Sequence, residues 1–181
     1  YNSTAGTMNI SALVYGTGSW ASGGNVNTAR MTSAASGTQT ASLVYGGTTG
    51  SFTAETEKYN GTAWTEVNNL NTARGGLGGA GTQDAALAFS GTTGSFTTVT
   101  EKYNGTSWTE LNDLNVAKVY AAGFGTQTAA LFAAGYNTAA SVTTELWNGS
   151  SWTEVNDLST ARFYVSGCGS TTAGLVVSGF N

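Results

Sequence analysis

One stretch of this chain recurs four times at an unvarying interval of 44 residues. Residues 56–74 have the sequence TEKYNGTAWTEVNNLNTAR, and residues 100–118 and 144–162 repeat it with few changes. Residues 12–30 hold a more divergent copy that keeps the tryptophan and the closing NTAR. A fixed period between about 20 and 50 residues predicts stacked supersecondary units, so this repeat constrains the fold more than any other feature.

Each repeat is expected to contain four short β-strands. Thr, Val, Tyr, Phe and Trp are prominent in four runs per copy, whereas Gly and Asn dominate the gaps. In the second copy the runs cover residues 74–79, 84–90, 96–103 and 107–112. The Asn-Gly pairs that begin at Asn60, Asn104 and Asn148 predict tight type I′ hairpins. No helical period of useful length is present, so the sequence indicates an all-β fold.

Four strands per 44 residues are the content of one β-propeller blade. The 181 residues are four periods plus five, so residues 177–181 occupy the same repeat positions as residues 1–5. The N-terminal piece would then carry the last two strands of a blade, and the C-terminal piece its first two. We expect residues 1–181 to form a single propeller domain of four blades, with the closing blade shared by the two ends. A segment of a larger or two-chain ring is the alternative.

The first strand of each blade is rich in Gly, Ala and Ser. Small side chains suit the strand nearest the ring axis, where the blades converge, and the tryptophan strand would then lie toward the rim. This interpretation assigns the innermost strands to residues 31–36, 75–80, 119–124 and 163–168.

The repeat resembles the kelch motif. Gly46-Gly47, Tyr59-Asn60-Gly61, Trp64 and Arg74 correspond to its diglycine, tyrosine, tryptophan and connecting run. The phrases GAGTQDAALAFSGTTGSF and TEKYNGTSWTELNDLN are similar to the kelch-like, galactose-oxidase-like repeats of tailed phages of aquatic bacteria. This resemblance implies a β-propeller and an extracellular or virion location, but a shared fold does not assign function.

Composition excludes several function classes. Only 9% of the residues are charged and the net charge is −4, which leaves no basic footprint for nucleic acid. No apolar run approaches the roughly 20 residues that span a bilayer, so membrane insertion is not expected. Cys168 is the only cysteine, so the chain can form no internal disulfide.

Enzymatic chemistry is also not expected. The chain has no histidine, which removes His-based triads, His metal sites and the histidine copper ligands of the galactose oxidases. Most acidic residues recur once per repeat, as Glu57, Glu101 and Glu145 do. Equivalent copies around a ring supply several similar environments, whereas a catalytic pair needs two carboxyls in different environments at one place. We therefore expect no cofactor and no metal.

Two repeated positions have both a structural and a binding interpretation. A tryptophan once per blade could stack sugars, but the preferred interpretation is core packing between blades. A cation once per blade could bind a carboxylate or phosphate, but pairing with the repeated glutamates is preferred. These positions are Trp20, Trp64, Trp108 and Trp152, and Arg30, Arg74, Lys118 and Arg162.

Positions that differ among the copies are better candidates for a ligand site, because shared residues build the blade. The start of the innermost strand is Met31-Thr32, Gly75-Gly76, Val119-Tyr120 and Phe163-Tyr164 in the four copies, and a later position is Ser36, Ala80, Phe124 and Cys168. Aromatic residues on two adjacent blades suit a sugar or protein contact, although uneven core filling would also explain them. The candidate ligand-binding residues are Met31, Tyr120, Phe124, Phe163 and Tyr164.

Two functions follow from these features. The first is a non-enzymatic recognition or adhesion module of a phage or extracellular surface, which binds a glycan or a host surface protein through loops on one face of the ring. The second is a structural decoration or assembly subunit that packs against other copies or other virion proteins. The near-identical Gly-Thr-Gln loops favour the second function, and the low charge and phage-like repeats favour the first.

Overall fold

The structure is a computed structural model that describes residues 22–181. Within this range the chain forms fourteen β-strands and no helix, so no helix there could cross a membrane. The strands are β1 (Ala34–Thr38), β2 (Ala41–Tyr45), β3 (Thr56–Tyr59), β4 (Trp64–Val67), β5 (Gly78–Gly81), β6 (Ala86–Phe89), β7 (Thr100–Tyr103), β8 (Trp108–Glu110), β9 (Ala122–Gly125), β10 (Ala130–Ala133), β11 (Thr144–Trp147), β12 (Trp152–Glu154), β13 (Ser166–Gly169) and β14 (Gly174–Val177).

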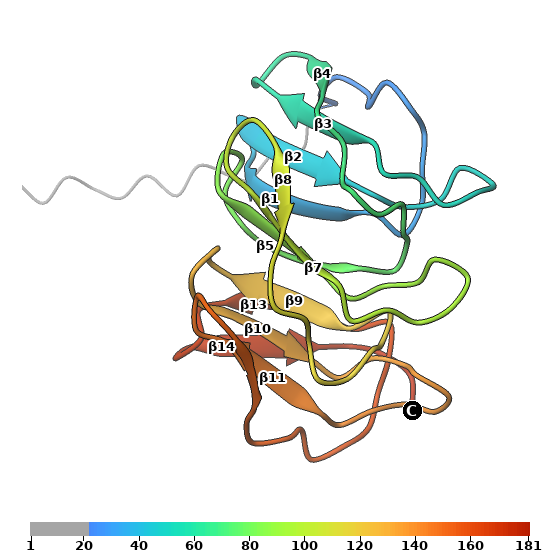
Figure 1. The fold of residues 1–181 in the computed structure, drawn as a ribbon, viewed down its shortest axis with the longest axis vertical. Helices are drawn as coiled ribbons and strands as arrows, with labels where there is room; N and C mark the ends of the chain where they lie inside the picture. Colours follow the sequence, from blue (N-terminus) through green and yellow to red (C-terminus); the bar gives the residue numbers. More distant parts are fainter. Residues whose placement is uncertain (1–21) are drawn as a thin grey trace, which may run out of the picture.

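Three four-stranded antiparallel sheets follow one another along the chain. The strand orders are β1-β2-β3-β4, β5-β6-β7-β8 and β9-β10-β11-β12, and β13 and β14 form a two-stranded sheet. In Figure 1 the loops after β2, β6 and β10 project to the same side, where the C-terminus also lies. The prediction of an all-β fold built from 44-residue repeats is therefore confirmed.

The first strands of successive sheets lie next to one another. β5 packs beside both β1 and β9, and β13 packs beside β9. Glycine permits this approach, since a Cβ on Gly78 would lie 2.7 Å from a ring carbon of Phe132 in the third sheet and one on Gly123 would lie 2.8 Å from the backbone nitrogen of Gly79 in the second. The small residues of these strands thus serve close packing between sheets, as the composition indicates.

Two local predictions need correction. The first strands begin three residues later than expected, because the residue at the second predicted position has a left-handed backbone that a strand cannot contain; Thr32, for example, has φ 55°. The Asn-Gly hairpins form, but with four-residue loops. The Asn60 side chain accepts hydrogen bonds from the N–H groups of Thr62 and Ala63, and only Gly61 has positive φ, so the turn is not type I′.

The hydrophobic core lies between neighbouring sheets. Tyr45 of the first sheet packs against Trp108 of the second, with ring centroids 4.9 Å apart. Phe89 of the second sheet packs in the same way against Trp152 of the third. Phe124 and Val165 belong to a smaller cluster that joins the third sheet to β13 and β14. Side-chain packing thus joins each sheet to the next one along the chain.

The predicted closing blade is only half described. Its last two strands are expected within residues 10–24, most of which lie outside the described residues, as do residues 1–5 and Trp20. Within residues 22–181 the fourth sheet has two strands, and it does not pair with the first sheet.

Candidate functional site

The four repeats meet at one end of the molecule, which we call the mouth. The second residue before each first strand has a left-handed backbone, with φ of 55°, 62°, 55° and 54° at Thr32, Gly76, Tyr120 and Tyr164. Backbone hydrogen bonds connect these residues across the repeats: Gly76 donates to Thr32 at 2.9 Å, Tyr120 donates to Gly76 at 3.1 Å, and Val165 donates to Tyr120 at 3.4 Å. Positive φ is unusual for Thr and Tyr, so the mouth holds backbone strain of the kind that gathers at binding sites.

A cavity of about 280 Å³ opens at the mouth. Tyr120 and Tyr164 lie beside each other in its wall, with ring centroids 4.3 Å apart and ring planes inclined by 27°. Gly76 leaves room for this pair, because a Cβ there would lie 3.0 Å from a carbon of the Tyr120 ring. Every repeat contributes to the lining, which consists of Thr32, Ser33, Gly76, Leu77, Tyr120, Ala121, Tyr164, Val165 and Ser166.

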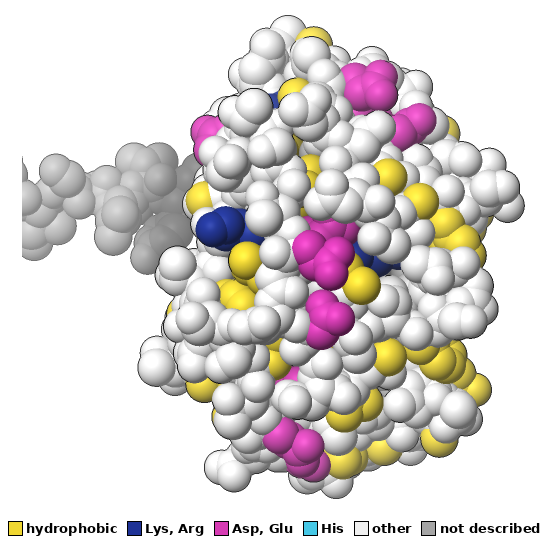
Figure 2. Space-filling view, viewed as in Figure 1, with side chains coloured by type: hydrophobic (Ala, Val, Ile, Leu, Met, Phe, Trp, Pro, Cys, Tyr) yellow, Lys and Arg dark blue, Asp and Glu magenta, His cyan; other side chains and the backbone are white. Residues whose placement is uncertain are grey.

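More aromatic residues extend this pair across the mouth. Phe163 lies 5.2 Å from Tyr164, 5.4 Å from Tyr136 and 6.0 Å from Phe180, measured between ring centroids. Phe96 continues the set, 6.2 Å from Tyr136. Hydrophobic side chains accordingly gather at the right-hand side of Figure 2, over the loops that project there in Figure 1. We call this set the mouth aromatic cluster; it comprises Phe96, Tyr120, Tyr136, Phe163, Tyr164 and Phe180.

The mouth aromatic cluster is open to solvent and carries polar tyrosine hydroxyl groups as well as aromatic faces. Phe96, Tyr164 and Phe180 expose 42%, 52% and 66% of their surface. Partial burial, with a smaller effect from Tyr164, raises the pKa of Tyr120, so its phenol is neutral and able to donate a hydrogen bond at neutral pH. Aromatic faces combined with hydroxyl donors suit ligands that have both apolar and polar faces, as sugars do.

The structure separates the five candidate ligand residues. Tyr120, Phe163 and Tyr164 belong to the mouth aromatic cluster. Met31 is 67% exposed and its backbone pairs with Thr48, but it is not among the residues that line the cavity. Phe124 does not share this surface, because it is 7% exposed and packs in the core between the third sheet and β13–β14. At Phe124 the uneven core filling considered above is the better interpretation.

Three members of the mouth aromatic cluster were missed by sequence reasoning. Tyr136 and Phe180 occupy a position where the first two repeats have Thr48 and Thr92. Each of these four residues forms a β-bridge with the residue directly before the left-handed position of its own repeat. Tyr136 pairs in this way with Val119, and Phe180 with Phe163. Comparing the loops position by position would have found them, since the substitution is confined to the third and fourth repeats. Phe96 escapes that comparison because the first repeat has Phe52 at the same position.

The repeated tryptophans connect neighbouring sheets. Trp108 and Trp152 are 6% and 5% exposed. Their indole N–H groups donate to the side-chain hydroxyls of Thr56 and Thr100 in the preceding sheet, at 3.2 Å and 2.9 Å. Their ring faces are thereby covered and unavailable to a sugar, whereas Trp64 is only half-buried.

The repeated cations lie beside the repeated glutamates. Arg74 and Glu101 are fully buried, with Nη1 of Arg74 3.1 Å from Oε1 of Glu101 in an ion pair that lacks the alignment of a hydrogen bond. Arg30 also pairs with its glutamate, Glu57, and there Nη2 of Arg30 donates a hydrogen bond to Oε1 of Glu57. Arg162 differs, because this half-buried residue donates from its guanidinium to the Ser178 carbonyl at 2.8 Å.

Lys118 takes the place of arginine in the third repeat. Its ammonium is fully buried and donates to the backbone carbonyl and hydroxyl of Thr143 at 2.7 Å and 3.0 Å. Desolvation lowers the pKa of Lys118 to about 8, and the nearby Glu145 carboxylate opposes that shift.

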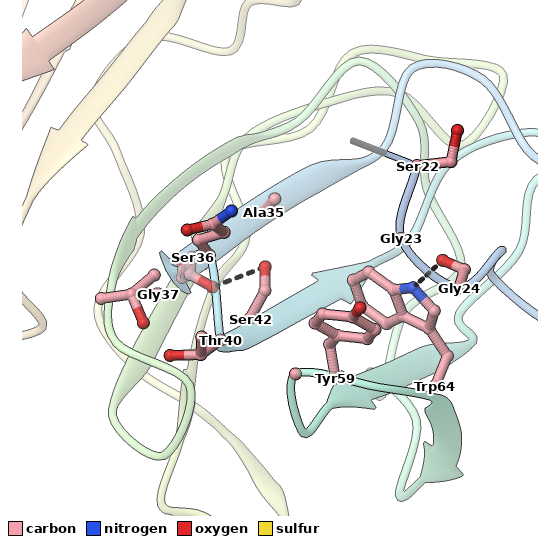
Figure 3. A pocket seen from close by; sticks show the side chains of 13 residues that line it. Ser22, Gly23, Gly24, Ala35, Ser36, Gly37, Thr40, Ser42, Tyr59 and Trp64 are labelled. Atoms are coloured by element: carbon pink, nitrogen blue, oxygen red, sulfur yellow. Dashed lines mark hydrogen bonds between the residues drawn. The ribbon is translucent and has the colours of Figure 1, made fainter. Parts of the chain in front are cut away.

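A cavity of about 700 Å³ lies on the side of the first sheet that faces away from the second. Tyr59 and Trp64 form part of its wall, with ring centroids 4.9 Å apart (Figure 3). The Trp64 N–H donates to the Gly24 carbonyl at 2.8 Å, as Figure 3 also shows. In the second and third sheets the preceding sheet covers the same side, so this cavity marks an uncovered packing surface.

Within residues 22–181 no group of three Cys, Asp or Glu side chains is arranged to hold a metal ion. No protein-family model matches the chain, and none of the curated proteins compared with it shows significant similarity.

Proposed function

We propose that this chain is a non-enzymatic recognition module, a closed four-bladed β-propeller that binds a glycan or a surface protein at the mouth aromatic cluster. The observation that carries the proposal is the stacked Tyr120–Tyr164 pair at a cavity to which all four repeats contribute. Convergence of four repeats on one cavity is the geometry of a ring mouth, and such mouths commonly bind ligands in rigid repeat scaffolds.

Closure of the ring is supported by the surface of β14. Leu175 is 59% exposed, although its counterparts Leu43 and Leu87 are fully buried. Val177 is 43% exposed, and its counterpart Phe89 is also fully buried. A neighbouring sheet covers β2 and β6 at these positions, so β14 has the side chains for a contact that residues 22–181 do not complete.

The first sheet supplies the complementary surface. Tyr59 and Trp64 line the large uncovered cavity, whereas their counterparts Tyr103 and Trp108 pack under the preceding sheet. Gln39 lines the same cavity; its counterparts Gln83 and Gln127 donate to backbone carbonyls of the preceding sheet. In the proposed ring, residues 12–15 pair with β14, residues near Trp20 add the outer strand, and the completed sheet packs on Tyr59 and Trp64.

The low charge and the excess of Thr, Ser, Asn and Gly support display on an extracellular or virion surface. A structural subunit that assembles with other copies remains the second candidate, since the exposed edge of β14 would also suit pairing between chains. The two functions differ in what the mouth does, because a structural subunit needs no ligand there.

A glycan array tests the recognition function. The purified 181-residue chain should bind a defined set of glycans, and the double variant Tyr120→Ala/Tyr164→Ala should lose that binding at least tenfold while it melts as a folded protein. Phe52→Ala, in the equivalent loop of the first repeat but outside the mouth aromatic cluster, is the matched control. Binding that survives in the double variant would reject this site. Ordered assemblies with no glycan or host-surface binding would favour the structural subunit.

A further inference from the structure

Five rings of the mouth aromatic cluster follow one another from the second sheet to the fourth. Phe96 lies in the loop after β6, Tyr136 in the loop after β10, and Phe163 and Tyr164 in the segment before β13. Neighbouring ring centroids in this order lie 6.2 Å, 5.4 Å and 5.2 Å apart, and the Tyr120 centroid lies 4.3 Å beyond that of Tyr164. We call these five residues the aromatic row. Their spacing is close to the length of one pyranose unit in an extended glycan, so consecutive sugar units can each meet a ring.

Backbone hydrogen bonds hold two central residues of the aromatic row in place. Tyr136 donates to Val119 and accepts from it, both at 2.9 Å. Phe163 exchanges the same pair of hydrogen bonds with Phe180, also at 2.9 Å. The row is therefore formed without a ligand, and a preformed site loses little conformational entropy on binding.

The segments that form the mouth contain no charged side chain. Asp, Glu, Lys, Arg and His are absent from residues 31–33, 48–52, 75–77, 92–96, 119–121, 136–140, 163–165 and 178–180. They are also absent from residues 1–21, so the N-terminal segment can bring no charged side chain to the mouth. A charged ligand group desolvated here would find no counter-charge in these segments, which is costly. The mouth therefore favours an uncharged ligand.

A cation directly precedes each mouth segment, but its charged group has partners within the protein. Arg30 and Arg74 pair with glutamates of their sheets. Lys118 is fully buried and donates to backbone carbonyls. Arg162 donates to a backbone carbonyl of its own repeat. Hydrogen bonds and ion pairs thus engage all four cations away from the aromatic row.

Uncharged polar groups flank the aromatic row. Thr93 and Ser95 lie just before Phe96, and Thr138 lies two residues after Tyr136. All three flanking residues are exposed. Their hydroxyls, like those of the tyrosines, can both donate and accept hydrogen bonds, as sugar hydroxyls require.

We propose that the mouth binds an uncharged glycan chain, with several consecutive sugar units lying along the aromatic row. This step rests on the recognition function proposed above and chooses between its two ligand classes. Aromatic faces beside hydroxyl groups match the apolar faces and hydroxyls of neutral sugars. A surface protein fits less well, because the hot spots of protein interfaces combine aromatic residues with arginine, which the mouth segments lack.

Titration of the 181-residue chain with oligosaccharides of increasing length tests this inference. The probes are neutral series of glucose, galactose, mannose and N-acetylglucosamine units, and oligogalacturonates as the acidic counterpart. At least one neutral series should bind about three- to tenfold more tightly for each added unit, up to about four units, as expected of one aromatic contact per unit. Oligogalacturonates of the same length should bind at least about tenfold more weakly, because the mouth offers no counter-charge.

Phe96→Ala tests the far end of the aromatic row. A disaccharide should occupy the stacked Tyr120–Tyr164 end, so Phe96→Ala should leave disaccharide affinity unchanged. The same variant should lose about three- to tenfold in affinity for the longest chains. Phe52→Ala is the matched control, since Phe52 lies in the identical loop of the first repeat, with 37% of its surface exposed, but belongs to no pair of the row. Its affinity should equal that of the unchanged chain at every length.

The outcomes separate this inference from the recognition function. Affinity that does not rise with chain length, or an equal loss in Phe96→Ala and Phe52→Ala, would overturn the extended ligand while glycan recognition stands. Oligogalacturonate binding as tight as that of the neutral series would overturn the uncharged ligand. Failure of every neutral series to bind would overturn the glycan, and a host surface protein bound through Tyr120 and Tyr164 would then be the partner. The recognition function itself fails only if host-surface binding is absent as well.

Discussion

At the scale of single residues, the buried cations carry a high desolvation cost. A buried charge costs several kcal/mol to desolvate and needs both a counter-charge and hydrogen bonds. Arg74 has the Glu101 carboxylate and the Ala88 carbonyl, whereas Lys118 relies on Thr143 and on the Phe132 ring, 5.0 Å from its ammonium. The third repeat is therefore the one in which the cation can lose its proton.

Lys118 should make stability depend on pH. Its folded-state pKa of about 8 lies below the ordinary value of 10.5, so between these values the unfolded chain binds more protons and stability rises with pH. From pH 7 to pH 9.5 we expect the free energy of unfolding to rise by about 2 kcal/mol through this group. Lys118→Arg, whose side chain keeps its charge, should lack this rise.

Urea unfolding of both proteins at the two pH values measures the difference. Burial raises the pKa of Tyr45, so above the ordinary tyrosine pKa of 10.0 the unfolded chain loses this proton before the folded chain does. The free energy of unfolding then falls with pH, and the comparison should stop below pH 10. An equal pH dependence in the unchanged chain and in Lys118→Arg would show that Lys118 does not titrate in this range.

The residue scale is also where sequence reasoning was least complete. Position-by-position differences among repeats identified Tyr120, Phe163 and Tyr164, because aromatic residues there replace small ones in other copies. The same argument selected Phe124, which fills space beside glycines Gly167 and Gly174 in the core. A sequence position does not say on which side of a strand a side chain lies relative to the next sheet, so surface and core substitutions look alike.

At the scale of elements, each of the three four-stranded sheets is joined to the loop that enters it by its repeated glutamate. The strand order within each sheet follows from the repeat, since four short runs with intervening turns form a meander. The turn geometry could not be predicted as well, because the Asn60 side chain satisfies two backbone N–H groups and makes a four-residue loop competitive with a type I′ turn. The start of each first strand was also missed, because positive φ at Tyr120 and Tyr164 has no sequence signal.

Arg74→Ala should destabilise the second sheet. The change leaves Glu101 buried without its counter-charge, and breaking a buried pair in this way costs about 3–5 kcal/mol. Urea unfolding measures this loss. The control is Lys58→Ala, since Lys58 pairs with the exposed Asp84 and its removal should cost less than about 1 kcal/mol. Unchanged stability of Arg74→Ala combined with lost ligand binding would instead make the cation column a binding site.

At the scale of the whole molecule, the 44-residue period predicts the sheets and their succession but not the contact between the two ends. That contact depends on whether a divergent N-terminal copy can replace the regular third and fourth strands. Ala12 and Leu13 stand where the other copies have Thr and Glu, so the copy has lost the hydroxyl that receives the tryptophan N–H as well as the carboxylate. The N-terminal copy keeps Tyr15, Trp20 and the NTAR segment, which are the residues that pack and connect.

Ring closure fixes a specific register. Tyr45 pairs with Thr56, Phe89 with Thr100 and Ala133 with Thr144, so closure pairs Val177 with Ala12. Directly opposed residues of antiparallel strands have Cα atoms about 4.5–5.5 Å apart, a separation that a disulfide can bridge.

The most direct test is oxidative cross-linking of Ala12→Cys/Val177→Cys in a Cys168→Ser background, followed by mass spectrometry of the proteolytic fragments. We expect an intrachain disulfide in a monomer, and little cross-linking in the control Leu13→Cys/Val177→Cys, whose side chains would lie on opposite faces of the sheet. Absence of the first disulfide, equal cross-linking in both variants, or cross-links only between chains would contradict a ring closed by the two ends of one polypeptide.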